Sequence, residues 1–375
     1  MRRRTALLAP LPLLAGHAWS NGSIEPTDAE PVQKLATAWR LTGATAPDTG
    51  DRVGVIEIDW AAARVRVLAE TAVPTRAHGL LPLPDGGFMA VATRPGRWLL
   101  RCDASGQVQR RLDTTADDPQ RTFDGHVECS ADAAWLYTVE TDPGTGAGWV
   151  SVRDARTLAR VAQFPSGGID PHQLLRAADG ALLLANGGIV RDASGRKIDL
   201  ERMAPVLSRI DPASGHLLGQ WQLPDARLSM RHLAWSDGPE PLLGIALQAE
   251  HDQPQQRAEA PLLAVWDGRT LSVPSRDAIG GGYAGDIAAG PGGGYVLSAQ
   301  KTGQGLWWHP GRPAMLTRVA ELTEPCALVS WPGAAGVTLN AARGIARWHA
   351  RLPPRMLAWP VPLAPDNHAV RLVAA

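Results

Sequence analysis

The sequence predicts an all-β fold, a seven-bladed β-propeller with four-stranded blades whose last blade is shared between the two chain ends. Three observations predict it: a four-stranded unit that repeats, a polar or reactive residue at one position in every unit, and incomplete units at both ends. Repeats of about 40–60 residues made of short strands are typical of propellers. A chain of 375 residues is long enough for one such domain.

Six complete units follow one another along the chain. Each has four runs of β-branched, aliphatic and aromatic residues, separated by Gly, Asp, Ser or Pro, as expected for short strands and tight turns. The first runs begin, in order, with "HGLLPLPDG", "HVECSADA", "PHQLLRAADG", "RHLAWSDG", "GDIAAGPGGG" and "CALVSWPG". The third unit carries an insertion at about 190–205, between its second and third strands.

The two ends of the chain supply a seventh unit. The segments "ATAWRLTGAT", "DRVGVIEID" and "ARVRVLAE" near the N-terminus have the pattern of second, third and fourth strands, and "NHAVRLV" near the C-terminus has that of a first strand. Joined, they close the ring and leave no open sheet edge between the first and last blades. The predicted propeller domain therefore spans residues 35–375.

The N-terminal residues predict export. Three arginines precede a short apolar run, and small residues follow it, so residues 1–20 are interpreted as a signal peptide cleaved after Ala18 or Ser20. The run is too short to be a transmembrane segment. Arg3–Arg4 leaves the Sec and twin-arginine routes both open. Residues 21–34 are expected to be a flexible segment, and the predicted location is the periplasm.

Equal numbers of basic and acidic residues, 37 each, give no electrostatic reason to expect a nucleic-acid partner. The three cysteines form no CxxC motif, so neither a zinc ribbon nor an attached haem is indicated.

One residue per blade occupies the same register at the start of the innermost strand. These residues are His78, His126, His172, His232, Asp286, Cys326 and His368. The polar residue that ends the second strand follows 14 residues later in four blades (Glu140, Asn186, Gln300, Asn340) and 16 residues later in two (Arg94, Gln248). Since partners in an antiparallel hairpin face each other, the two sets are expected to form two polar rings at the channel mouth.

Imidazole, carboxylate and thiolate groups are ligands for first-row transition metals, so the inner ring predicts a site for iron, copper or zinc. Seven evenly spaced positions are expected to lie too far apart for all to bind one ion. Neighbouring residues are therefore preferred: His78, His126 and His172, with His232 and His368 as alternates and Glu140 nearby. The remaining candidate ligand-binding residues are Arg94, Asn186, Arg231, Gln248, Asp286, Gln300 and Asn340. A different interpretation stays open, in which these histidines only fasten blades together through hydrogen bonds.

Several segments, among them "FPSGGIDPHQLL", "ANGGI", "LSMRHLAW" and "DNHAV", resemble a family of exported bacterial propellers catalogued as domain-of-unknown-function family 1513. The resemblance covers roughly residues 35–370, and the family is similar to WD-repeat and YVTN-type propellers. It implies a metal-linked role, because the genes of the family share a context with those of imelysin-type periplasmic iron-uptake proteins. The matching residues are His78, Arg94, His126, Glu140, His172, Asn186, Arg231, His232, Asn367 and His368.

Three functions are compatible with these observations. The preferred one is a periplasmic binding or accessory protein in metal acquisition, with iron as the expected metal and imelysin-type proteins as possible partners. The second is an enzyme, a metal-dependent lactonase-like hydrolase in which a metal-bound water attacks. The third is a protein-interaction scaffold without a metal.

Overall fold

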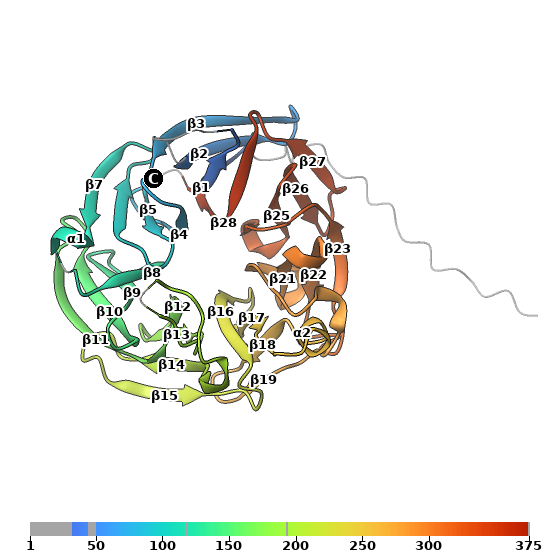
Figure 1. The fold of residues 1–375 in the computed structure, drawn as a ribbon. Coiled ribbons are helices and arrows are strands. Elements are labelled where there is room, and N and C mark those ends of the chain that lie inside the picture. Colours follow the sequence, from blue (N-terminus) through green and yellow to red (C-terminus); the bar gives the residue numbers. More distant parts are fainter. Residues whose placement is uncertain (1–31, 44–49, 118, 193, 374–375) are drawn as a thin grey trace, which may run out of the picture.

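The structure, a computed structural model, describes residues 32–43, 50–117, 119–192 and 194–373. Seven antiparallel sheets of four strands are arranged in a ring around one axis (Figure 1), so the predicted seven-bladed propeller is confirmed. The predicted signal peptide lies outside the described residues. The first strand begins at Gln33, so Gln33 and Lys34 belong to the propeller and not to the flexible segment expected over residues 21–34.

Blades 1 to 3 follow the first three predicted units. From the axis outward, their strands are β4 (Ala77–Pro82), β5 (Phe88–Ala92), β6 (Trp98–Cys102) and β7 (Val108–Asp113) in blade 1; β8 (Thr122–Cys129), β9 (Trp135–Thr141), β10 (Ala147–Asp154) and β11 (Arg160–Ile169) in blade 2; and β12 (Pro171–Arg176), β13 (Leu182–Asn186), β14 (Val206–Ile210) and β15 (Leu217–Trp221) in blade 3.

Blades 4 to 7 complete the ring. Their strands are β16 (Leu228–Trp235), β17 (Leu243–Ala249), β18 (Leu263–Trp266) and β19 (Leu271–Ser272) in blade 4; β20 (Ile287–Gly290), β21 (Gly294–Ala299), β22 (Gln304–Trp308) and β23 (Thr317–Glu321) in blade 5; β24 (Leu328–Ser330), β25 (Gly336–Ala341), β26 (Gly344–His349) and β27 (Arg355–Ala358) in blade 6; and β28 (Leu363–Leu372), β1 (Gln33–Leu41), β2 (Asp51–Asp59) and β3 (Arg64–Ala72) in blade 7.

The helices are short and lie in connections between strands. They are α1 (Thr114–Asp117), α2 (Pro254–Ala258) and the 3-10 turns η1 (Leu200–Arg202), η2 (Ala278–Gly280), η3 (Pro291–Gly293), η4 (Gln300–Thr302) and η5 (Pro332–Ala334). In the part of the chain that the structure describes, no helix has the length and apolar character needed to cross a membrane.

The core consists of seven apolar layers, each formed by two neighbouring blades. The second strands β5, β13 and β17 are buried along their whole length because a blade packs on each of their faces. Strands covered on both sides are continuously apolar instead of alternating. The outermost strand of blade 1, β7, is mostly exposed. Apolar burial is therefore greatest between blades, and each blade depends on both of its neighbours.

Blade 7 joins the two ends of the chain, as predicted. Strand β28 pairs with β1 along its length, from Lys34 opposite Leu372 to Leu41 opposite Leu363. The side chain of Gln33 also fastens this blade, because its Oε1 accepts hydrogen bonds from Trp60 Nε1 at 3.2 Å and from Thr338 Oγ1 of blade 6 at 3.0 Å. The innermost strand of the last blade thus comes from the final residues of the domain.

Candidate metal centre

Five histidines project from the innermost strands of five blades: His78 on β4, His126 on β8, His172 on β12, His232 on β16 and His368 on β28. In all five blades, the pairing of the inner strand with its neighbour shifts register where the histidine lies. A bulge of this kind leaves a residue outside the regular ladder and re-aims its side chain. The common register read from the sequence corresponds to these bulges.

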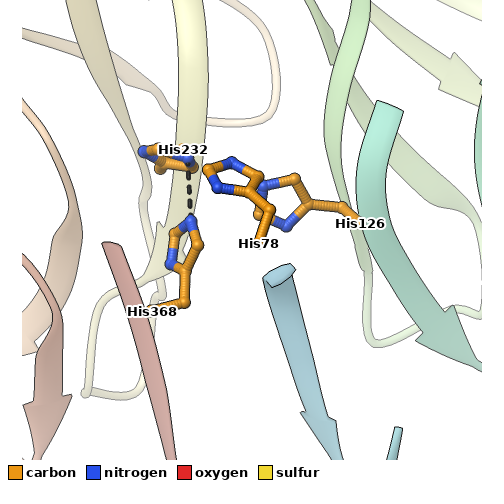
Figure 2. Close-up of side chains that lie close together, drawn as sticks. All are labelled: His78, His126, His232 and His368. Atoms are coloured by element: carbon orange, nitrogen blue, oxygen red, sulfur yellow. Dashed lines mark hydrogen bonds between the residues drawn. The ribbon is translucent and has the colours of Figure 1, made fainter. Parts of the chain in front are cut away.

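Four of these side chains meet near the axis (Figure 2). His78, His126, His232 and His368 each offer one nitrogen, and these atoms all lie within 4.8 Å of one another. Each residue is at most 8% exposed. We refer to this set as the His cluster. Its geometry corrects our expectation that only sequential neighbours come close enough: the imidazoles reach inward from blades 1, 2, 4 and 7, and His172 lies beside the group.

Arg94 fixes the protonation of His172. The Nη2 group of Arg94 contacts His172 Nδ1, and a guanidinium can only donate, so this nitrogen is the acceptor. The proton of the neutral ring is therefore on Nε2, which lies 2.8 Å from His232 Nε2. His232 Nε2 accepts this hydrogen bond and carries no proton of its own.

His368 reaches the same atom from the other side. Its Nδ1 lies 3.4 Å from the carboxylate of Asp286, so a proton on Nδ1 faces the negative charge. Its Nε2 lies 3.0 Å from Nε2 of His232, so this atom of His232 has two imidazole neighbours. Ligand nitrogens about 2.0–2.1 Å from one ion are roughly 2.9 Å apart when they subtend a right angle.

Several nitrogens of the His cluster lack partners. Among the described residues, neither nitrogen of His78 has a hydrogen-bond partner, and the same holds for His126 Nε2 and His232 Nδ1, although all of these atoms are buried. Buried polar atoms are normally paired, and leaving them unpaired is costly. A metal ion near the axis would use one nitrogen of each ring, so the residues present fit such an ion.

Two carboxylates support the cluster from behind. Asp286 accepts the backbone N–H groups of Ile287 at 2.9 Å and Leu328 at 2.8 Å, which fixes it beside His368. Asp366 is held by the guanidinium of Arg76 and lies 4.0 Å from His78 Nδ1. Carboxylates placed behind imidazoles orient the rings and raise their basicity. Asp286 was predicted as a ligand-binding residue; Asp366 was missed, although it lies on the same strand as His368.

Cys326 lies in the inner register but keeps its proton. Burial raises the pKa of its thiol to about 12. Its Sγ donates a hydrogen bond to the carbonyl oxygen of Asn340 at 3.3 Å. A thiolate is the form that binds metals, so Cys326 is a packing residue in this state.

The family profile described as "Protein of unknown function (DUF1513)" matches residues 71–372, which is most of the propeller. The chain belongs to the DUF1513 family. A search of curated proteins finds no match.

Among solved structures, this DUF1513 propeller is similar to three proteins. They are a hydrazine synthase from Kuenenia stuttgartiensis (TM-score 0.57, 14% identity, 84% of this chain and 91% of that one), a streptogramin B lyase (TM-score 0.56, 11% identity, 85% and 93%) and a virginiamycin B lyase from Staphylococcus aureus (TM-score 0.54, 10% identity, 76% and 85%). At these identities the likeness shows the fold alone.

The predicted outer ring does not face the His cluster of this DUF1513 chain. Glu140 is fully buried inside blade 2, where it pairs with Arg153 at 2.9 Å and accepts hydrogen bonds from Thr138 and Ser151, both at 2.8 Å. Its strand partner is Phe123 and not His126. The expectation of a facing pair is therefore wrong, because the bulge moves the histidine out of the regular ladder.

The other second-strand residues also bind neighbouring protein groups. The side-chain amides donate to nearby oxygens: Asn186 to Ser166 O, Val206 O and Ser208 Oγ, Gln248 to Ala284 O, Gln300 to Asn367 Oδ1, and Asn340 to Thr37 Oγ1. These contacts fasten strands and blades.

Asp170 is the centre of a charged network that sequence reasoning missed. It accepts Arg94 at 2.5 Å, Arg191 at 2.6 Å and Arg231 at 2.9 Å. Burial alone would raise the pKa of Asp170, but the charges of these three arginines outweigh it and hold the pKa far below its usual range. Nearby, burial raises the pKa of Asp124 to about 7. Two of the predicted ligand-binding residues, Arg94 and Arg231, therefore belong to this network.

The metal-free protein should lose stability in mild acid. Burial, and next the charge of His368, hold the pKa of His78, His126 and His232 well below the ordinary histidine value. Below about pH 6.5 the unfolded chain therefore takes up protons that the folded rings do not, and folding is disfavoured. We expect the melting temperature of metal-free protein to fall between about pH 7 and pH 5. In the combined variant H78A/H126A/H232A the melting temperature should depend less on pH. If it fell as steeply with pH as in the wild type, these three rings would not be the cause of the acid sensitivity.

Proposed function

We propose that this DUF1513 chain is a metal-binding propeller that holds one first-row transition-metal ion in the His cluster. The observation that carries the proposal is the convergence of four buried imidazoles, which each place one nitrogen within 4.8 Å of the others. Several of their buried nitrogens have no hydrogen-bond partner among the described residues. Neutral imidazoles suit zinc, copper, nickel and iron(II). The low pKa values of three of the four rings favour the unprotonated form that binds metals.

We further propose that the protein works in the periplasm as an accessory of metal acquisition, with iron as the first metal to test. The signal-like N-terminus and the gene context implied by the family support this. Ligands that are at most 8% exposed favour an ion that stays bound over a cargo that is picked up and released. The protein would then meet imelysin-type uptake proteins with its ion in place. The same burial disfavours the hydrolase, since a catalytic ion needs an open position for water and substrate.

The test is elemental analysis of protein recovered from the periplasmic fraction, carrying an affinity tag without histidines. We expect about one transition-metal ion per chain, and a melting temperature that rises when the matching ion is returned to metal-free protein. Iron, copper and zinc are compared at equal concentration. If the purified protein contains no metal and no added ion changes its melting temperature, metal binding is ruled out and the scaffold function remains. Turnover of a lactone by the loaded protein would instead point to the hydrolase.

A further inference from the structure

A pocket of about 160 Å³ lies where blades 1, 2 and 3 meet. Its polar wall includes Arg94 after β5, Asp124 on β8 and Thr141 on β9. The segment between β13 and β14, which is the predicted insertion, closes the pocket and contributes Arg191. The insertion thus builds a site that a regular hairpin at this position would leave open.

The charges at this pocket do not balance. Three guanidiniums, those of Arg94, Arg191 and Arg231, converge on the single carboxylate of Asp170. With Asp124 ionised as well, these five side chains keep one positive charge, and the two other charged residues of the wall, Arg202 and Asp192, balance each other. Arg94 and Arg191 line the pocket and keep side-chain exposures of 13% and 18%. Arg191 donates from Nε to Asp170 and from Nη1 to the carbonyl oxygen of Gly195, and its Nη2 has no hydrogen-bond partner among the described residues.

Part of the wall is apolar. Ile169, Ile189, Pro143 and Val190 line the same pocket. Inorganic phosphate would leave this apolar surface unused, whereas a carboxylate carried on a short hydrocarbon chain can contact both the guanidiniums and the apolar side chains. Guanidinium groups bind carboxylates with strong, directional, often bidentate hydrogen bonds.

We propose that this pocket binds a small organic carboxylate, whose oxygens accept N–H groups of Arg94 and Arg191 and whose carbon chain lies against the apolar wall. Arg94 also donates to His172, which in turn contacts His232. The ligand would therefore lie two side chains away from the His cluster. The proposal needs no ion in the cluster, so it stands or fails independently of the proposed function.

Calorimetric titration at low ionic strength tests the proposal, using the full chain as purified and with its metal content measured first. The probes are acetate, propionate and succinate, with inorganic phosphate as the comparison and chloride as the salt control. We expect saturable binding of at least one carboxylate that is tighter than that of phosphate. The variant R191Q should weaken it about tenfold or more, and R191K by less, because lysine keeps the charge but loses the planar fork.

Two further variants separate binding from folding. V190W fills the pocket and keeps every guanidinium, so it should also abolish binding. R209Q removes an arginine of the same blade that is paired with Asp179 outside the pocket, and it should bind like the wild type. Absence of carboxylate binding by folded wild-type protein would overturn the proposal. Preference for phosphate, or equal affinities of wild type and V190W, would overturn it as well.

Discussion

A chain that lacks residues 366–375 should no longer unfold in one cooperative transition. The deletion removes most of β28, the innermost strand of blade 7, and exposes the edge of β1 along its ladder. It also takes apolar residues such as Ala369 out of the layer between blades 6 and 7. A native domain is stable by only about 5–15 kcal/mol, so loss of a complete inner strand is expected to exceed what the fold can tolerate.

The measurement is a thermal melt followed by circular dichroism, together with the elution volume in gel filtration. We expect a broad or absent transition and aggregation through the open strand edge. Since the deletion also removes His368, the single variant H368A is the matched control and should still melt cooperatively. A truncated protein with the wild-type melting profile would show that β28 is not needed to close the ring.

Replacing His232 and His368 together by Ala should abolish metal binding. These residues supply two of the four converging imidazoles, and the remaining rings of His78 and His126 cannot complete a coordination shell. At an ion concentration about 100 times the dissociation constant, binding stabilises a folded protein by ~2.7 kcal/mol, and the variant should lose this increment. Melting curves with and without iron, copper and zinc, combined with elemental analysis, measure it. H216A, which removes an exposed histidine, should keep the full shift.

Single variants of metal-free protein distinguish ligands from fasteners. His78 has no hydrogen-bond partner among the described residues, so H78A breaks no hydrogen bond and costs only packing. His172 contacts both Arg94 and His232, so H172A should lose roughly 1 kcal/mol or more per hydrogen bond. If H78A destabilised the metal-free protein more than H172A, the cluster would have to be understood as a fastener.

The fold could be predicted almost completely because its signals are local. Each blade is a run of short strands and turns, and the missing first strand near the N-terminus pointed directly to "NHAVRLV". The histidines could also be found, since one residue per blade recurs in one register. What the register could not reveal is the bulge at each histidine. For this reason Glu140 was expected to face His126, whereas it pairs with Arg153 within its own blade.

The contacts between histidines across the axis could not be predicted from the sequence either. We preferred His172 over His232 and His368 as a metal ligand because it lies on a blade next to that of His126. Spacing along the chain does not reveal how far an imidazole reaches into the channel. Asp170 shows the same limit. It was an ordinary turn residue in the sequence, and only the fold brings arginines from blade 1, blade 4 and the insertion to its carboxylate.

The positions of the cluster residues along the chain determine when an ion can be bound. His78 lies on the first inner strand and His368 on the last, and the two side chains meet only after the ring has closed. A nascent or unfolded chain therefore contains no precursor of the site, and the compartment in which the protein folds also decides which ions compete for it. If the chain crosses the membrane unfolded, the periplasm supplies the metal. If it crosses folded, the choice is made in the cytoplasm, under a different set of free-metal concentrations.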